Sequence, residues 1–161
     1  MAVPEFKIRE AGHALGVGVA VLVTSEDHPG CILLSQRLKS DGAGTFALPG
    51  GHLAFGETFE ECSVRETKEE TGLDLGNCRV CATCNALDAS QSYHYITIFT
   101  IGAVIGEPTN LEPEKHSDWQ WVRWSDPEFP KNLFTALKIV REKGSADCSV
   151  CYFLPRGLWQ F

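Results

Sequence analysis

The sequence lacks the features that define several classes of protein. Its 161 residues contain no apolar run long enough to span a bilayer, and the first seven residues carry no apolar core of signal-peptide type. Lysine and arginine number only 14 against 21 acidic residues, so the formal net charge is -7. A non-specific nucleic-acid binder would be basic. We therefore expect a cytoplasmic protein that binds neither a membrane nor a nucleic-acid polymer.

Cysteine is present in an odd number, seven, without a secretion signal, so reduced thiols are expected. Cys78, Cys81 and Cys84, like Cys148 and Cys151, are spaced as in zinc knuckles. The first three fall in a predicted strand, where alternation turns Cys81 away from the other two. We interpret these cysteines as small core residues, and a zinc-knuckle scaffold is the alternative.

The chain has the length and composition of one domain, residues 1–161, that can bury a core. Four tryptophans and nine phenylalanines support a globular protein. The order of apolar periodicities predicts an α/β (α+β) fold with a mixed sheet and helices. Strands are expected at residues 16–25 and 31–37, which we interpret as a hairpin, and at 45–48, 77–87, 92–104 and 119–124; helices are expected at 58–71 and 133–143.

The helix predicted at residues 58–71 follows the glycine turn Pro49-Gly50-Gly51. No Gly-Lys-Ser/Thr follows these glycines, so the turn is not a P-loop. Thr58 and Glu61 have the spacing of a capping box, in which each side chain satisfies a free backbone N–H. Gly72 stands where a left-handed C-terminal cap is expected. The helix therefore has a defined start and end.

One face of this helix is acidic where an apolar stripe is expected. Phe59 and Cys62 begin the stripe, which continues at 3.6 residues per turn onto three carboxylates: Glu66, Glu69 and Glu70. Carboxylates near a core repel each other and lose solvation, and a divalent cation offsets both effects. Oxygen ligands favour a hard ion, Mg²⁺ or Mn²⁺.

A simpler interpretation of the acidic face is a solvated surface with an Arg65–Glu69 pair at i,i+4 spacing. Lys68, Glu60 and Thr71 already form a polar face on the other side of the helix. A helix that is polar all round is a poor structural element, which favours the metal site.

The longer pattern from Gly51 to Leu73 resembles the signature of the Nudix hydrolases. Thr67 is its one departure, since the family usually has an aliphatic residue there. Threonine is β-branched and close in shape, so we expect no loss of function. The matching positions are Gly51, Glu57 and the run Arg65-Glu66-Thr67-Lys68-Glu69-Glu70-Thr71-Gly72-Leu73.

This resemblance implies a mixed sheet between helices and Mg²⁺-dependent hydrolysis of a nucleoside diphosphate linked to another group. It implies that Glu66 and Glu70, with Glu69 close behind, are metal ligands and that the Gly51 carbonyl is a further ligand. It implies a structural ion pair between Glu57 and Arg65. Any of the three glutamates that the metal leaves free is a candidate base.

Other segments are similar to the MutT-type nucleoside-triphosphate diphosphatases, namely residues 46–53, 93–97 and 111–115. This similarity implies cleavage of (deoxy)nucleoside triphosphates to monophosphate and pyrophosphate, with 8-oxo-dGTP among the candidate substrates, and homodimerisation. It implies a further metal carboxylate from Glu112 or Glu114, with Glu114 preferred. Arg37 is a candidate phosphate contact, and the implied base-pocket residues are Leu48, Thr97, Phe134, Thr135, Ala136 and Leu137, although core packing explains Phe134 and Leu137 equally well.

Two alternatives stay open. One is a diphosphatase that acts on another nucleoside diphosphate derivative or a short isoprenoid diphosphate. The other is a non-catalytic nucleotide-binding module, which the retained signature glutamates disfavour.

Overall fold

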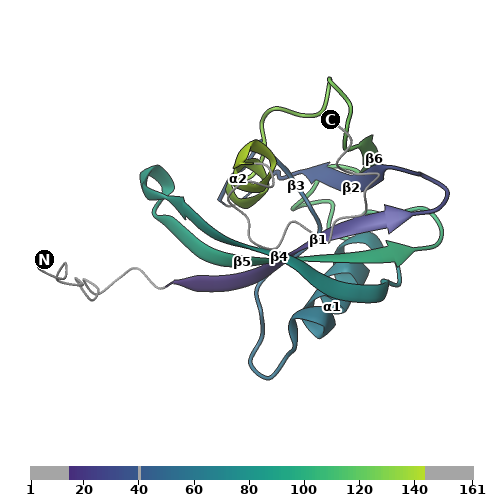
Figure 1. Ribbon diagram of the computed structural model, residues 1–161, viewed down its shortest axis with the longest axis horizontal. Coiled ribbons are helices and arrows are strands. Elements are labelled where there is room, and N and C mark those ends of the chain that lie inside the picture. The colour runs from purple at the N-terminus through teal and green to yellow at the C-terminus, as the bar shows by residue number, and fades with distance from the viewer. Residues whose placement is uncertain (1–14, 40, 144–161) are drawn as a thin grey trace, which may run out of the picture.

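A computed structural model describes residues 15–39 and 41–143 of the chain (Figure 1). Cys148 and Cys151 lie outside the described residues. The elements, in chain order, are β1 (Gly16–Ser25), β2 (Cys31–Gln36), β3 (Phe46–Ala47), α1 (Phe59–Thr71), β4 (Gly76–Asp88), the 3-10 helix η1 (Ala89–Gln91), β5 (Tyr93–Val104), β6 (Gln120–Arg123) and α2 (Thr135–Lys143).

The strands of the described residues form two three-stranded sheets. The first has the order β1-β5-β4, with β1 parallel and β4 antiparallel to β5, and the second has the order β3-β2-β6. Helices α1 and α2 lie on opposite sides of the first sheet (Figure 1). The predicted α+β fold with a mixed sheet between helices is confirmed. Within the described ranges, neither helix is long and apolar enough to cross a membrane.

The predicted hairpin of the first two strands is wrong, because β1 and β2 belong to different sheets. β1 pairs with β5, and β2 pairs with β3 and β6. The other edge of β1 is already occupied by the glycine turn. The N–H groups of Val19 and Val21 donate to the carbonyls of Gly51 and Pro49 at 2.9 and 2.8 Å. β2 therefore has no edge of β1 to join.

Each face of the first sheet has its own apolar cluster. Val19, Val21 and Val23 of β1 face α1 and pack with Cys62, whereas Leu22 faces the other side, toward α2. Since β1 alternates sides in this way, its backbone position is fixed from both faces. The glycine turn that pairs with β1 is fixed by the same packing.

A β-bulge changes the predicted directions of the cysteines in β4. Cys78 packs in the cluster near α1, but Cys81 and Cys84 both pack in the cluster near α2. The alternation is broken by a register shift between Val80 and Ala82. The prediction that Cys81 faces away from Cys84 is therefore wrong. Both are buried core side chains, as predicted.

The caps predicted for α1 are present. The Glu61 N–H donates to the Thr58 hydroxyl at 3.1 Å, and the Thr58 N–H donates to the Glu61 carboxylate at 2.9 Å. Gly72 ends the helix in the left-handed conformation, with φ of 73°. An N-cap of this kind stabilises a helix by about 1 kcal/mol. The helix is thus held at both ends by local interactions.

Helix α1 packs on the sheet through small polar residues at every fourth position. Ser63, Thr67 and Thr71 are fully buried, so the prediction that Thr71 belongs to a polar outer face is wrong. The Ser63 hydroxyl lies 2.8 Å from that of Thr100, and Thr71 donates to the Thr67 carbonyl at 2.6 Å. The Thr67 hydroxyl has no hydrogen-bond partner among the described residues. Short side chains allow the helix to lie close to the sheet.

An ion pair fastens the loop before α1 to the helix. Arg65 donates to both oxygens of Glu57, at 2.6 and 3.0 Å, and to the carbonyl of His52 at 3.2 Å. The Ala54 N–H also donates to Glu57, at 3.0 Å. The Arg65 hydrogen bonds, and then that of Ala54, lower the pKa of Glu57 from 4.5 to about 2. This geometry agrees with the structural ion pair that the resemblance implies.

Replacing Thr67 with valine is expected to stabilise the fold. The substitution removes a buried hydroxyl that loses its water and gains no partner, which should raise the free energy of unfolding by about 1 kcal/mol. For a chain of this size that corresponds to roughly 2–4 °C in Tm. Thr71→Val is the matched control, since its hydroxyl is bonded, and it should lower Tm. Calorimetry gives both values, and a Thr67→Val Tm at or below wild type would contradict the assignment.

Acidification should remove the contribution of the Glu57–Arg65 pair. The pKa of Glu57 is depressed in the folded protein, so its stabilisation is present above about pH 4.5 and is lost as pH falls toward 2. In EDTA, the Tm gap between wild type and Glu57→Gln should therefore narrow from pH 6 to pH 2.5. A gap that stays constant over this range would show that Glu57 is not held as an ion pair.

Candidate active site

Two glycines allow the turn after β3 to approach both β1 and α1. Gly50 has φ of 148°, and a side chain there would overlap the carbonyl oxygen of Val19. A Cβ on Gly51 would lie 2.5 Å from a carboxylate oxygen of Glu66. The absence of both side chains lets the Glu66 carboxylate rest against the backbone of the turn.

The three glutamates predicted as metal ligands do not share one environment. The side chains of Glu66 and Glu70 are 14% and 6% exposed, whereas that of Glu69 is 53% exposed. Arg65 lies 2.7 Å from Glu66 and 3.2 Å from Glu69. Burial raises the pKa of Glu66, and the hydrogen bond from Arg65 opposes that rise. The buried pair therefore carries an unfavourable charge that a cation would offset.

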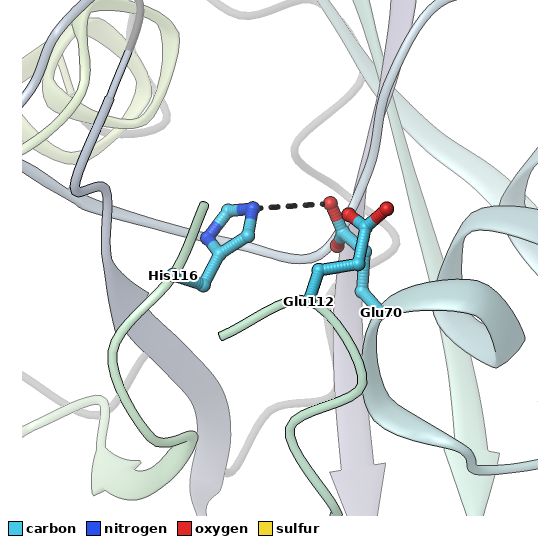
Figure 2. A group of neighbouring side chains, drawn as sticks. All are labelled: Glu70, Glu112 and His116. Atoms are coloured by element: carbon cyan, nitrogen blue, oxygen red, sulfur yellow. Dashed lines mark ion pairs between the residues drawn. The ribbon is translucent and has the colours of Figure 1, made fainter. Parts of the chain in front are cut away.

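Glu70 lies at the point where helix, turn and loop meet (Figure 2). One of its carboxylate oxygens accepts a hydrogen bond of 3.0 Å from the Gly50 N–H, and the other lies 3.3 Å from Nε2 of His116. Its backbone carbonyl accepts hydrogen bonds from the Leu111 N–H and the Trp119 indole, at 3.1 and 3.2 Å. These bonds tie the loop that follows β5 to the end of α1.

That loop brings two further side chains with potential metal-ligand atoms close to Glu70. Ligand atoms of Glu70, Glu112 and His116 all lie within 4.8 Å of one another (Figure 2). Glu114 is exposed and lies outside this group, so the loop carboxylate near Glu70 is Glu112 rather than the predicted Glu114. Helical or strand periodicity cannot choose between the two in a loop.

The sequence analysis missed His116 entirely. The one local signal was Asn110, whose side chain accepts from the Glu112 N–H at 3.1 Å and donates to the His116 carbonyl at 2.9 Å. An Asn side chain that closes a turn on its own loop is common. Here the hydrogen bonds of Asn110 hold both ends of the segment that carries Glu112 and His116.

The donors present fit a divalent cation. Carboxylate oxygens from Glu66 and Glu112, which are partly buried, and from Glu70, which is buried, are the ligands that Mg²⁺ and Mn²⁺ prefer. The Gly51 carbonyl accepts a hydrogen bond from the Val19 N–H at 2.9 Å, and a carbonyl oxygen has two lone pairs, so it can bind a cation as well. The arrangement can therefore concentrate negative oxygens beside a backbone turn, where a cation and a phosphate can meet.

A pocket adjoins the turn and is lined in part by Gly50 and Gly51 themselves. Thr135 begins α2 and is not among the lining residues, and its contact with the base stays a prediction. The predicted residues that do line the pocket are Arg37, Leu48, Thr97, Phe134, Ala136 and Leu137.

Aromatic side chains form one wall of the pocket, and two of them, Tyr93 and Tyr95, were not among the predicted pocket residues. Tyr93 and Tyr95 stack with centroids 4.6 Å apart, and Phe134 meets Tyr93 edge-on at 5.3 Å. The Tyr95 hydroxyl lies 2.7 Å from Nε2 of His52. Alternation along β5 places Tyr93, Tyr95 and Thr97 on one face, which was the available signal.

Arg37 lies over the ring of Phe134, with its guanidinium carbon 4.6 Å from the ring centroid. It also donates to the Asp41 carbonyl at 2.9 Å. This cation–π contact orients the guanidinium along the pocket wall. Contact of Arg37 with a phosphate stays a prediction.

Comparison with known proteins gives relatives of this chain. An ADP-ribose pyrophosphatase of Methanocaldococcus jannaschii is 44% identical over 112 residues, which cover 69% of this chain and 64% of that protein. A putative 8-oxo-dGTP diphosphatase 3 of Mycobacterium tuberculosis is 34% identical over 101 residues, which cover 58% of this chain and 44% of that protein. The chain thus spans less than two thirds of the length of either relative.

The fold and the domain family agree with these relatives. The crystal structure of a MutT NUDIX hydrolase from Burkholderia pseudomallei matches with a TM-score of 0.71 at 28% identity, covering 80% of this chain and 97% of that one. A profile of the NUDIX domain matches residues 14–142, which include the glycine turn, α1 and the loop of Glu112. The chain that carries this buried glutamate cluster belongs to the Nudix hydrolase family.

Proposed function

We propose that this Nudix hydrolase cleaves a phosphoanhydride bond of a (deoxy)nucleoside triphosphate, releasing a monophosphate and pyrophosphate, with Mg²⁺ as cofactor and Mn²⁺ as a substitute. The observation that carries this proposal is the shared Gly50–Gly51 turn. Its Gly50 N–H bonds to Glu70, Gly51 lies against Glu66, and both glycines line the aromatic pocket. A base stacked in the pocket would bring its phosphates near the glutamates.

The chain's own residues divide the work of the reaction. When bound, the divalent cation neutralises phosphate charge and activates water. Glu66, Glu70 and Glu112 would hold it. Arg65 balances part of the charge of Glu66 while it fastens the loop to α1. Glu69 is exposed and forms an ion pair of 3.2 Å with Arg65. It is one candidate to accept a proton in the reaction. Any other glutamate of the cluster that the cation leaves free is also a candidate.

Substrate binding is assigned to the aromatic wall. Tyr93, Tyr95 and Phe134 offer ring faces and edges, and base–aromatic stacking is worth about 1–3 kcal/mol per base. Leu48, Ala136 and Leu137 form an apolar part of the lining. Such walls accept any flat base, so they support a nucleotide substrate without selecting one base.

A second candidate substrate is another nucleoside diphosphate derivative. It is favoured by the Methanocaldococcus jannaschii relative, which is named an ADP-ribose pyrophosphatase. The same glutamates and turn would serve both substrates, because both contain a phosphoanhydride. Homodimerisation stays a prediction from the resemblance, and a cytoplasmic location stays a prediction from the sequence composition.

Removing the charge of Glu66 or Glu70 is expected to abolish most activity. Glu66→Gln and Glu70→Gln should each lower kcat by at least about 100-fold, because the cation loses a carboxylate ligand while side-chain volume is kept. Pyrophosphate release in Mg²⁺ measures the effect, and EDTA should reduce wild type to the same level. Glu60→Gln is the matched control, an equal charge change on the same helix, and it should keep wild-type kcat. Near-wild-type turnover in both test variants would remove the proposed site.

Substrate choice is decided by a panel of nucleotides analysed by chromatography of the products. We expect kcat/KM to be highest for a nucleoside triphosphate, 8-oxo-dGTP being one of those tested, with pyrophosphate and monophosphate as products. Phe134→Ala should raise KM about tenfold through lost stacking. Highest kcat/KM for ADP-ribose would favour the second candidate. Highest kcat/KM for a short isoprenoid diphosphate would contradict both.

A further inference from the structure

A buried chain of polar side chains leads from β2 to the site through His116. The Ser35 hydroxyl lies 2.9 Å from Nδ1 of His116, and Nε2 of the same ring lies 3.3 Å from Glu70 (Figure 2). Counted over the whole residue, the exposed fractions of Ser35, His116 and Glu70 are 0%, 6% and 5%. Each comes from a different element, namely β2, the loop and α1. Buried polar groups in such a chain are satisfied by one another rather than by water.

The backbone of His116 is held as well. The backbone N–H of His116 donates to the Glu112 carbonyl at 3.1 Å, and the backbone carbonyl of His116 accepts from the Asn110 side chain at 2.9 Å. Trp119 stacks on the ring with centroids 5.3 Å apart and an interplanar angle of 27°. Trp119 on the ring face, Ser35 at Nδ1 and Glu70 near Nε2 therefore leave the imidazole little freedom to rotate.

The chemistry of Ser35 and Glu70 assigns the ring proton. An ionised carboxylate only accepts hydrogen bonds, so the nitrogen that faces Glu70 is the protonated one. In the tautomer with the proton on Nε2, Nδ1 accepts from the Ser35 hydroxyl. The other Glu70 oxygen accepts from the Gly50 N–H. One oxygen of Glu70 thus has a backbone donor and the other has the imidazole 3.3 Å away, which leaves further lone pairs for another partner.

We propose that His116, whose Nδ1 is hydrogen-bonded by Ser35, is a positioning residue that orients the Glu70 carboxylate for cation binding. The inference rests on the proposed role of Glu70 as a metal ligand. Glu70 and Glu112 have carboxylate oxygens within 4.8 Å of each other and of the His116 ring, so loss of the imidazole would leave the two carboxylates to repel without this neighbour. Partners that orient a metal ligand in this way typically change metal affinity by about 10- to 100-fold when they are removed.

The test is Mn²⁺ binding to the full chain without nucleotide, followed by electron paramagnetic resonance of the free ion. Ser35→Ala and His116→Leu should each weaken binding about tenfold. The double variant should bind no more weakly than His116→Leu alone, because Ser35 acts through His116. Ser117→Ala, the same change at the neighbouring loop–strand junction, is the matched control and should bind as wild type.

Two results would overturn the proposal. The first is wild-type Mn²⁺ affinity in Ser35→Ala, a small change that should fold even if His116→Leu does not. The second is directly coordinated nitrogen in the electron spin echo spectrum of the Mn²⁺-loaded wild type that is lost in His116→Leu, which would make His116 a ligand. The Glu70→Gln variant distinguishes failure of the proposed metal site from failure of the proposed positioning role. Unchanged Mn²⁺ affinity in Glu70→Gln would refute the metal site itself, whereas lost affinity there beside an unchanged Ser35→Ala would refute only the positioning role.

Discussion

The buried carboxylates of Glu66 and Glu70 are the constraint on which the rest of this structure depends. Two negative groups withdrawn from water on one helix face are costly unless the protein or a ligand compensates them. Here Arg65, the Gly50 N–H and His116 supply part of that compensation, and each comes from a different segment. The remaining lone pairs of these two carboxylates can bind a divalent cation. Such a cation would connect the acidic face of the helix with phosphoanhydride hydrolysis.

The fold can be understood as the support for this cluster. Small residues on the packed face of α1 bring the helix close to the sheet, and glycine at positions 50 and 51 brings the turn equally close from the other direction. The turn takes the free edge of β1, which sends β2 into the second sheet. β2 then carries Ser35 to the far side of His116. One local requirement, room for a carboxylate beside a backbone turn, is thus linked to the topology of both sheets.

The parts of this arrangement that could be predicted from sequence are the local ones. The capping box, Gly72 and the acidic stripe depend on spacing within one helix, and the family resemblance added five base-pocket residues that line the pocket. The predicted hairpin of β1 and β2 was wrong because the edge of β1 is occupied by the glycine turn, which is distant in sequence. The predicted direction of the Cys81 side chain was wrong because the sequence of the strand gives no sign of the β-bulge that breaks its alternation. The loop that carries Glu112 and His116 has no periodicity, so the resemblance offered Glu112 only beside Glu114, and His116 is revealed only by its proximity to Glu70 in the fold.

The most direct measurement of the central claim is a titration of the ¹⁵N-labelled protein with Mg²⁺, followed by amide chemical shifts and without any substrate. The account predicts that the shifts concentrate at the amides of Gly50, Gly51 and Glu70 and extend through the loop to Glu112, since these groups surround the proposed ion. Saturating Mg²⁺ that left these amides unchanged while shifting amides elsewhere would contradict the account.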